Sequence, residues 1–229
     1  TPTIFGATAI PTQVFSGPTP LSAFLNATYT PTALYVNTPR SAVSVDQFRI
    51  AKEAYDNKDW DVFISNMLLI EPLEPDSVDI PYYIGEAYRF KGDTTSATRY
   101  YRQAMNMNPA FGPAYLGLAR VGLMSNPDFK PEKLFNQAIE YDPNLGEAYL
   151  ERARWLIRRG DYADALPDLE LADKIMPGSP EVYLAYANSY LGDGDKEKAL
   201  EYAQKAYEAD VLNLPTYKLL GDLYIEKED

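Results

Sequence analysis

The sequence predicts an all-α fold in which similar helix pairs stack into a solenoid, and two regularities carry that prediction. A proline returns every 34 residues, at Pro75, Pro109, Pro143 and Pro177. Small residues keep the same period, at Ala51, Gly85, Ala119, Ala153, Ala187 and Gly221. One period held without an insertion indicates a stacked array of identical supersecondary units.

Composition narrows the class of protein. The chain has 229 residues and a net charge of −12, which argues against a general nucleic-acid binder because that function needs a basic surface. It has no cysteine and no histidine, so disulfides, thiolate metal sites and the usual general base are excluded. No apolar run is long enough to span a membrane. We therefore expect no catalytic residue, no cofactor, no metal and no direct membrane insertion.

The first 39 residues differ from the rest because none of them is charged. Nine threonines and six prolines alternate there with phenylalanine and tyrosine. Proline fixes φ and removes a backbone donor, so we expect an extended segment over residues 1–43. Two interpretations stay open. The segment is either a linker to an upstream part, or an extended ligand along the surface of the repeats or of a neighbouring molecule.

A sequence signature repeats within each period. In the reference unit, residues 78–111, offsets 8, 11, 20, 24, 27 and 32 hold Gly85, Tyr88, Ala97, Tyr101, Ala104 and Pro109. This pattern resembles the tetratricopeptide repeat (TPR), with about five and a half repeats over residues 44–229. The units are 44–77, 78–111, 112–145, 146–179 and 180–213, with a half unit at 214–229. The resemblance implies a right-handed superhelix of antiparallel helix pairs.

The turns inside the units have their own signal. Glycine followed by aspartate stands at Gly92-Asp93, Gly160-Asp161 and Gly194-Asp195, where glycine suits a left-handed residue and aspartate caps the second helix. Two departures give further predictions. In the third unit we expect the first helix to end early and the second to begin near Pro131. In the fifth unit Val211 replaces the proline, so its second helix is expected to run longer.

The resemblance also implies where a partner binds. In the TPR family the first helix of each unit lines a concave groove, and offsets 2, 5, 9, 12 and 13 face it. The candidate groove residues are Phe48, Lys52, Tyr55, Tyr82, Glu86, Arg89, Phe90, Leu116, Arg120, Leu123, Leu150, Arg154, Ile157, Arg158, Leu184 and Asn188. Four of them are arginines, which suit carboxylates or an acidic peptide. Alternatively, these arginines pair with glutamates such as Glu86 and Glu151 on neighbouring helices.

These features predict a non-catalytic scaffold that binds a peptide or protein segment in the concave groove. The groove arginines extend this prediction to acidic segments. One alternative is the regulatory or scaffolding arm of a larger enzyme. Another is a self-assembly module in which residues 1–39 dock in the groove of a neighbouring copy. The missing cysteine and the Thr/Pro segment slightly favour an exported or cell-surface bacterial protein over a cytoplasmic one.

Overall fold

The computed structural model describes residues 40–228, with side chains through Ile225. The predictions about residues 1–39 lie outside this part of the chain. Eleven α-helices and one short 3₁₀ turn make up the described part. They are α2 (Val45–Asp56), α3 (Trp60–Ile70), η1 (Glu71–Leu73), α4 (Asp79–Phe90), α5 (Thr94–Met107), α6 (Gly112–Ser125), α7 (Glu132–Tyr141), α8 (Gly146–Arg159), α9 (Tyr162–Ile175), α10 (Pro180–Asp193), α11 (Lys196–Ala209) and α12 (Leu214–Glu228).

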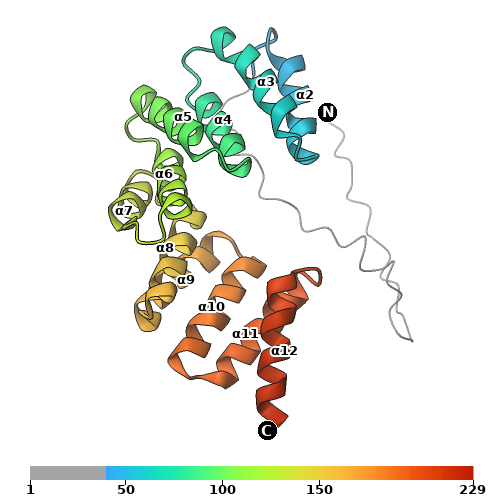
Figure 1. The fold of residues 1–229 in the computed structure, drawn as a ribbon, viewed down its shortest axis with the longest axis vertical. Coiled ribbons are helices and arrows are strands. Elements are labelled where there is room, and N and C mark those ends of the chain that lie inside the picture. Colours follow the sequence, from blue (N-terminus) through green and yellow to red (C-terminus); the bar gives the residue numbers. More distant parts are fainter. Residues whose placement is uncertain (1–39, 229) are drawn as a thin grey trace, which may run out of the picture.

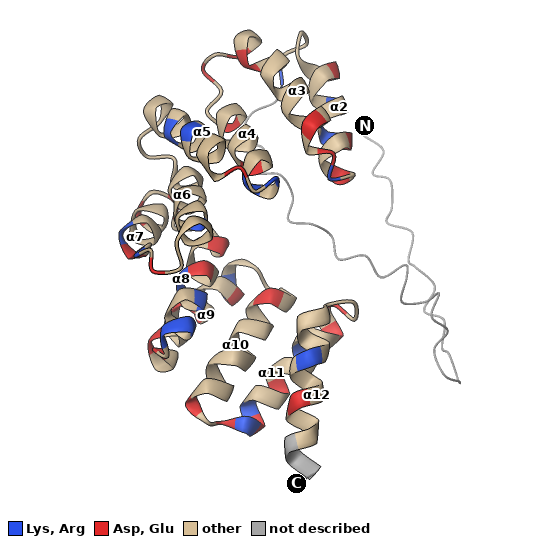
Figure 2. Cartoon of the chain, viewed as in Figure 1, with Lys and Arg blue, Asp and Glu red and all other residues tan. Residues whose placement is uncertain are grey.

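The helices form sequential pairs, from α2–α3 to α10–α11, and α12 follows alone. Each second helix contacts the first helix of the next pair, and α4 contacts α6 as α8 contacts α10. Figure 1 shows the pairs following one another along a curved arc, with α5 and α7 on its outer side. The fold is thus the all-α solenoid that the period predicts. Figure 2 shows charged residues of both signs distributed along the arc.

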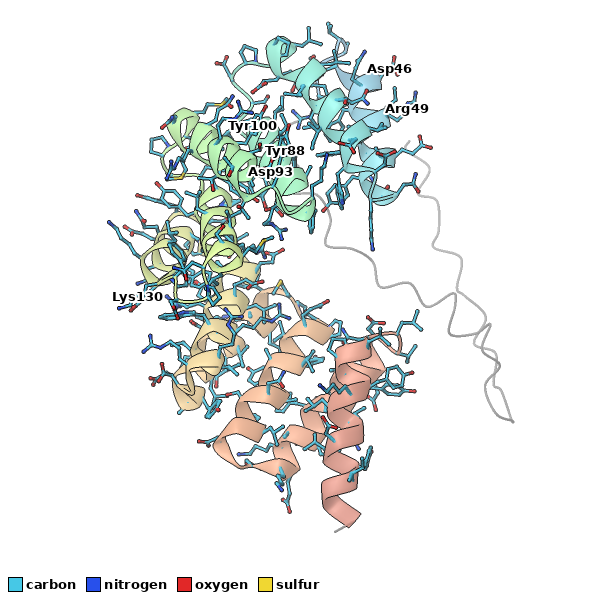
Figure 3. All side chains as sticks on the ribbon, viewed as in Figure 1. Asp46, Arg49, Tyr88, Asp93, Tyr100 and Lys130 are labelled. Atoms are coloured by element: carbon cyan, nitrogen blue, oxygen red, sulfur yellow. The ribbon has the colours of Figure 1, made fainter. Side chains whose placement is uncertain are left out.

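Small residues at offsets 6 and 8 let neighbouring helices approach each other. Tyr101 is completely buried, and its ring lies against Gly85 of α4 and Gly117 of α6. A Cβ atom on Gly85 would come within 2.9 Å of the Tyr101 ring, and one on Gly117 within 2.5 Å. Beside this contact, the rings of Tyr88 and Tyr100 stack with centroids 5.6 Å apart and join α4 to α5 (Figure 3).

The predicted turn chemistry is largely confirmed. Gly92, Gly160 and Gly194 have φ of 80°, 87° and 91°. Asp93 accepts a hydrogen bond from the backbone N–H of Ser96 at 3.0 Å, and Asp195 makes the same bond with Lys198. Asp161 precedes α9 but makes no capping bond. Its carboxylate instead lies 3.1 Å from Nε of Arg159.

The two predicted departures have mixed outcomes. Helix α7 begins at Glu132 directly after Pro131, as predicted. The early end of the preceding helix is wrong, because α6 continues to Ser125 and the ring of Phe129 packs against Gly122 in its last turn. The longer helix in the fifth unit is also wrong. Helix α11 ends at Ala209, as Asp210 accepts a hydrogen bond from the N–H of Leu212 in a local turn that needs no proline.

Lys58 occupies the glycine place in the first turn and gives a stability prediction. It has φ of 58°, the one positive value among non-glycine residues in the described chain. A left-handed side-chain residue costs about 1–2 kcal/mol, partly offset by the greater entropy of glycine in the unfolded chain. We expect Lys58→Gly to raise the free energy of unfolding by about 0.5–1 kcal/mol.

Urea denaturation of Lys58→Gly measures this gain, and hydrogen exchange of the α2 and α3 amides locates it. The reverse change at an equivalent turn, Gly92→Lys, serves as the control and should destabilise the protein because Gly92 also has positive φ. A stability unchanged by Lys58→Gly would show that this turn carries no strain.

Candidate functional site

The sixteen candidate groove residues fall into three classes of exposure. Four are buried: Tyr82, Glu86, Leu116 and Leu150. Eight are half-buried: Phe48, Tyr55, Arg89, Arg120, Leu123, Arg154, Ile157 and Leu184. The remaining four, Lys52, Phe90, Arg158 and Asn188, are exposed. A single continuous ligand surface therefore does not follow from the offsets alone.

The buried members fill space between helices. Leu116 and Leu150 belong to the apolar clusters that join successive units. The ring of Tyr82 meets Phe111 edge-on, with centroids 5.5 Å apart. Since a buried side chain offers no area to a ligand, we leave these three residues out of the binding surface proposed below.

Glu86 is the centre of a buried polar cluster. Arg89 donates two hydrogen bonds to its carboxylate, from Nε at 3.1 Å and from Nη2 at 2.6 Å, and the Tyr101 hydroxyl donates a third at 2.5 Å. Burial alone would raise the pKa of Glu86. The positive charges of Arg89 and Arg120 together with these hydrogen bonds outweigh burial, so the pKa lies below its ordinary value. Glu86 is therefore an ionised core group.

A second carboxylate extends the cluster along the first helices. Oε1 of Glu151 lies 3.7 Å from Nη2 of Arg120 and 3.6 Å from Nη1 of Arg154. The residues alternate in charge from α4 through α6 to α8. Arg120 thus pairs with a glutamate on a neighbouring helix, as the alternative predicts. Arg89 and Arg154 pair instead with glutamates on their own helices.

The N-terminal end of the groove is aromatic. The rings of Trp60 and Phe90 stack with centroids 4.7 Å apart and planes 14° from parallel, and Arg89 lies 4.2 Å over Phe90. Tyr55 meets Trp60 edge-on at 5.5 Å. The sequence offsets missed Trp60 because it begins α3, a second helix, and the offsets assign only first helices to the groove.

At this same end two candidate residues make contacts of their own. Phe48 is covered by Arg40, whose guanidinium lies 4.6 Å above its ring. Lys52 pairs with Asp56 on its own helix, at 3.1 Å. Phe48 is half-buried beneath Arg40, whereas the Lys52 side chain stays 58% exposed although its charge is paired.

A cavity of about 430 Å³ opens between α8 and α10. We call it the groove pocket. Five candidate residues line it together: Arg154, Ile157, Arg158, Leu184 and Asn188. Tyr162, Ala185, Leu191 and Gly192 complete the lining. The structure thus brings the candidates from two units into one site, and it adds residues that the offsets did not select.

Tyr162 shapes one side of the groove pocket. Its ring packs against Gly192, where a Cβ atom would come within 2.2 Å of the ring. Its backbone carbonyl accepts a hydrogen bond from Ser189 at 2.9 Å. The small residue at position 192 could have signalled this contact, since glycine inside a helix often marks a close approach.

Two polar side chains of the groove pocket keep free hydrogen-bonding capacity. Arg158 forms no ion pair in the described chain, unlike Arg154 on the same helix. Asn188 donates its amide N–H to the carbonyl of Leu184 at 2.8 Å, which leaves its side-chain oxygen as an acceptor. A cation, an acceptor and apolar walls together suit an extended chain with a nearby carboxylate.

Two family models of the tetratricopeptide repeat match this sequence, one over residues 82–111 and the other over residues 156–223. The chain is a tetratricopeptide repeat protein. TPR scaffolds generally mediate protein–protein interactions, and TPR repeats are typically non-catalytic. No curated protein matches the sequence at a significant level.

Solved structures share the TPR fold at low sequence identity. The thermophilic TPR protein TTC0263 of Thermus thermophilus has a TM-score of 0.66 and 17% identity, and the match covers 80% of this chain and 99% of that one. Pseudomonas aeruginosa pilF has a TM-score of 0.61 and 21% identity over 68% and 71%. YrrB, described as a TPR protein with an unusual peptide-binding site, has a TM-score of 0.52 and 18% identity over 76% and 90%.

Two further searches of the described residues concern metal sites and membrane spans. Among residues 40–225 no group of histidine, aspartate and glutamate side chains is arranged to hold a metal ion. None of the described helices is both long and apolar enough to cross a membrane.

Proposed function

We propose that this TPR protein is a non-catalytic scaffold that binds an extended peptide segment of a partner protein in the groove pocket between α8 and α10. The peptide carries a carboxylate that pairs with Arg158, while Asn188 accepts a hydrogen bond from the peptide backbone. Ile157 and Leu184 provide apolar contacts on either side of these groups. The unpaired guanidinium of Arg158 at the pocket is the observation that carries the proposal.

Charge balance supports an acidic rather than a basic segment. The cluster contains three arginines and two carboxylates, Glu86 and Glu151, so it keeps an excess of positive charge before Arg158 is added. This happens in a chain whose net charge is −12. A solved TPR structure described as having an unusual peptide-binding site is consistent with peptide binding by this fold.

A displayed library of random peptides, selected against the full chain, tests the proposal. We expect the selected peptides to be enriched in aspartate or glutamate. Arg158→Glu should weaken their binding by at least about tenfold, because it replaces an attractive charge pair by a repulsive one. Fluorescence anisotropy with labelled peptides measures the change, and circular dichroism confirms that the helices are intact.

Arg49→Glu is the matched control. Arg49 is exposed on α2, makes only a long contact of 3.9 Å with Asp46, and lies outside the groove pocket. The same charge reversal there should leave the affinity unchanged within about twofold. Equally weakened peptide binding in both variants would show that the effect comes from the net charge of the protein and not from the groove pocket. Full binding by Arg158→Glu would place the peptide elsewhere on the protein.

A further inference from the structure

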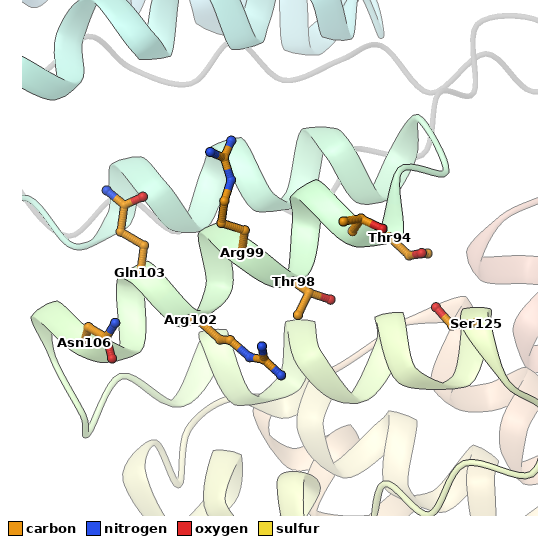
Figure 4. Close-up of a pocket in the computed structure, with 8 residues that line it drawn as sticks. Thr94, Thr98, Arg99, Arg102, Gln103, Asn106 and Ser125 are labelled. Carbon is orange, nitrogen blue, oxygen red and sulfur yellow. The ribbon is translucent and has the colours of Figure 1, made fainter.

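A second cavity, of about 700 Å³, lies on α5 and extends toward the end of α6. We call it the α5 pocket. Its lining residues are all polar, and none is acidic. Thr94, Thr98 and Arg102 belong to one row along the helix, at intervals of four residues, and Arg99 and Ser125 lie beside it. Figure 4 shows Arg102 pointing toward α6, the helix that carries Ser125.

The sequence around the α5 pocket has an unusual charge. Residues 94–125, which form α5 and α6, contain three arginines and no aspartate or glutamate. The whole chain has 33 acidic and 21 basic residues, so this segment is a local exception. Figure 2 shows basic residues on α5 without acidic ones. The opposite face of α5, with Tyr101 and Ala104, is buried in the core.

Ion pairing separates the arginines of this protein into two groups. Seven make an ion pair with a carboxylate: Arg40, Arg49, Arg89, Arg120, Arg152, Arg154 and Arg159. Three make none in the described chain: Arg99, Arg102 and Arg158. Arg158 lines the groove pocket, whereas Arg99 and Arg102 line the α5 pocket. Within residues 40–228, every arginine without a carboxylate partner thus lines a cavity.

Two carboxylates beside the ends of α5 already accept hydrogen bonds. Glu71 accepts a hydrogen bond from Gln103 at 2.6 Å, at one edge of the α5 pocket. Asp93, before the first turn of α5, accepts the capping bond from the N–H of Ser96. Arg99 lies 4.5 Å over the ring of Tyr100, which holds its side chain in place without neutralising its charge. The pocket therefore combines unneutralised guanidinium groups with hydroxyl donors.

This combination fits a phosphoryl group. A phosphate monoester presents three terminal oxygens, and guanidinium groups bind such oxygens with paired hydrogen bonds while hydroxyls donate singly. We propose that the α5 pocket binds a phosphorylated side chain of a partner protein. Arg102 contacts the phosphoryl oxygens, the hydroxyls of Thr98 and Ser125 donate to them, and Arg99 adds positive charge. This second site lies on the outer side of the arc, away from the groove pocket.

Spectra of the ¹⁵N-labelled full chain test the site with three probes: a blocked phosphoserine peptide, the same peptide without phosphate, and inorganic phosphate. We expect the phosphopeptide to shift amide signals of residues 94–103 and of Ser125, and the unphosphorylated peptide to shift none. Arg102→Glu should weaken binding of the phosphopeptide by at least about tenfold, because a hydrogen bond between charged groups is lost. Arg102 is exposed, so the variant should fold.

Arg49→Glu is the matched control, since it reverses an exposed charge on α2 that lines neither cavity and should leave phosphopeptide binding unchanged. Shifts confined to residues 94–103 and Ser125 keep this site separate from the groove pocket. Inorganic phosphate that binds as tightly as the phosphopeptide would overturn the assignment to a protein partner. Absence of shifts near Ser125, or equal binding by Arg102→Glu, would overturn the site itself.

Discussion

Replacing Glu86 with alanine is expected to lower the free energy of unfolding by about 3–5 kcal/mol, the cost of breaking a buried ion pair by removing one partner. The Glu86 residue is 8% exposed and its carboxylate accepts three hydrogen bonds. Without it, Arg89 keeps a half-buried charge and Tyr101 keeps a buried hydroxyl with no acceptor. Urea denaturation followed by circular dichroism measures the loss.

Two further variants give this prediction its controls. Glu147→Ala removes the same side chain from the partly exposed surface of α8 and should change stability by no more than about 0.5 kcal/mol. The double variant Glu86→Ala, Arg89→Ala should lose less than the sum of the two single losses, because it leaves no unpaired guanidinium. Strict additivity would show that the two side chains do not stabilise each other.

The pH dependence of stability reports on the same carboxylate. The pKa of Glu86 lies below its ordinary value of 4.5, so the folded state binds fewer protons than the unfolded state near that pH. Glu86 therefore contributes its full stabilisation of the folded state above pH 4.5. This stabilisation is lost as the pH falls through the lower pKa that Glu86 has in the folded protein. Glu86→Gln should show a smaller loss of stability over this interval than the unmodified protein.

The 34-residue period predicted the fold because it records contacts that every unit repeats. The side chain at offset 8 must be small where a neighbouring helix packs against it. The Gly-Asp pairs supply the left-handed residue and the helix cap of a tight turn. The two wrong helix lengths arise from contacts that belong to single units. Phe129 supports the end of α6 from a loop, and Asp210 ends α11 through a side-chain turn.

The candidate site was harder to predict than the fold. The offsets identified side chains on the first helices, but they could not decide which arginines meet a carboxylate, because that depends on side-chain conformations and distances between units. Arg89 and Arg154 proved to be paired, whereas Arg158 has no ion pair in the described chain. Arg99 and Arg102 were not among the candidates because they lie on α5, a second helix, and the offsets select residues of first helices alone.

Replacing Gly117 with leucine is expected to destabilise the protein by about 3 kcal/mol through overpacking. A Cβ atom there would already lie 2.5 Å from the ring of Tyr101, and that ring is completely buried between α4 and α6. The ring cannot move freely because its hydroxyl is bonded to Glu86 at 2.5 Å. The substitution should therefore disturb packing and the charged cluster together, and urea denaturation should show the loss.

The matched change Gly221→Leu should have the opposite sign. Gly221 occupies offset 8 of α12, where no atom of the described chain outside the helix's own backbone and the adjoining residues lies within 4 Å of a Cβ position. Leucine is a better helix former than glycine, so we expect a gain of about 0.5–1 kcal/mol. Destabilisation at both positions would mean that each glycine serves the backbone of its own helix. Opposite signs would show that the small residue is required by the neighbouring layer.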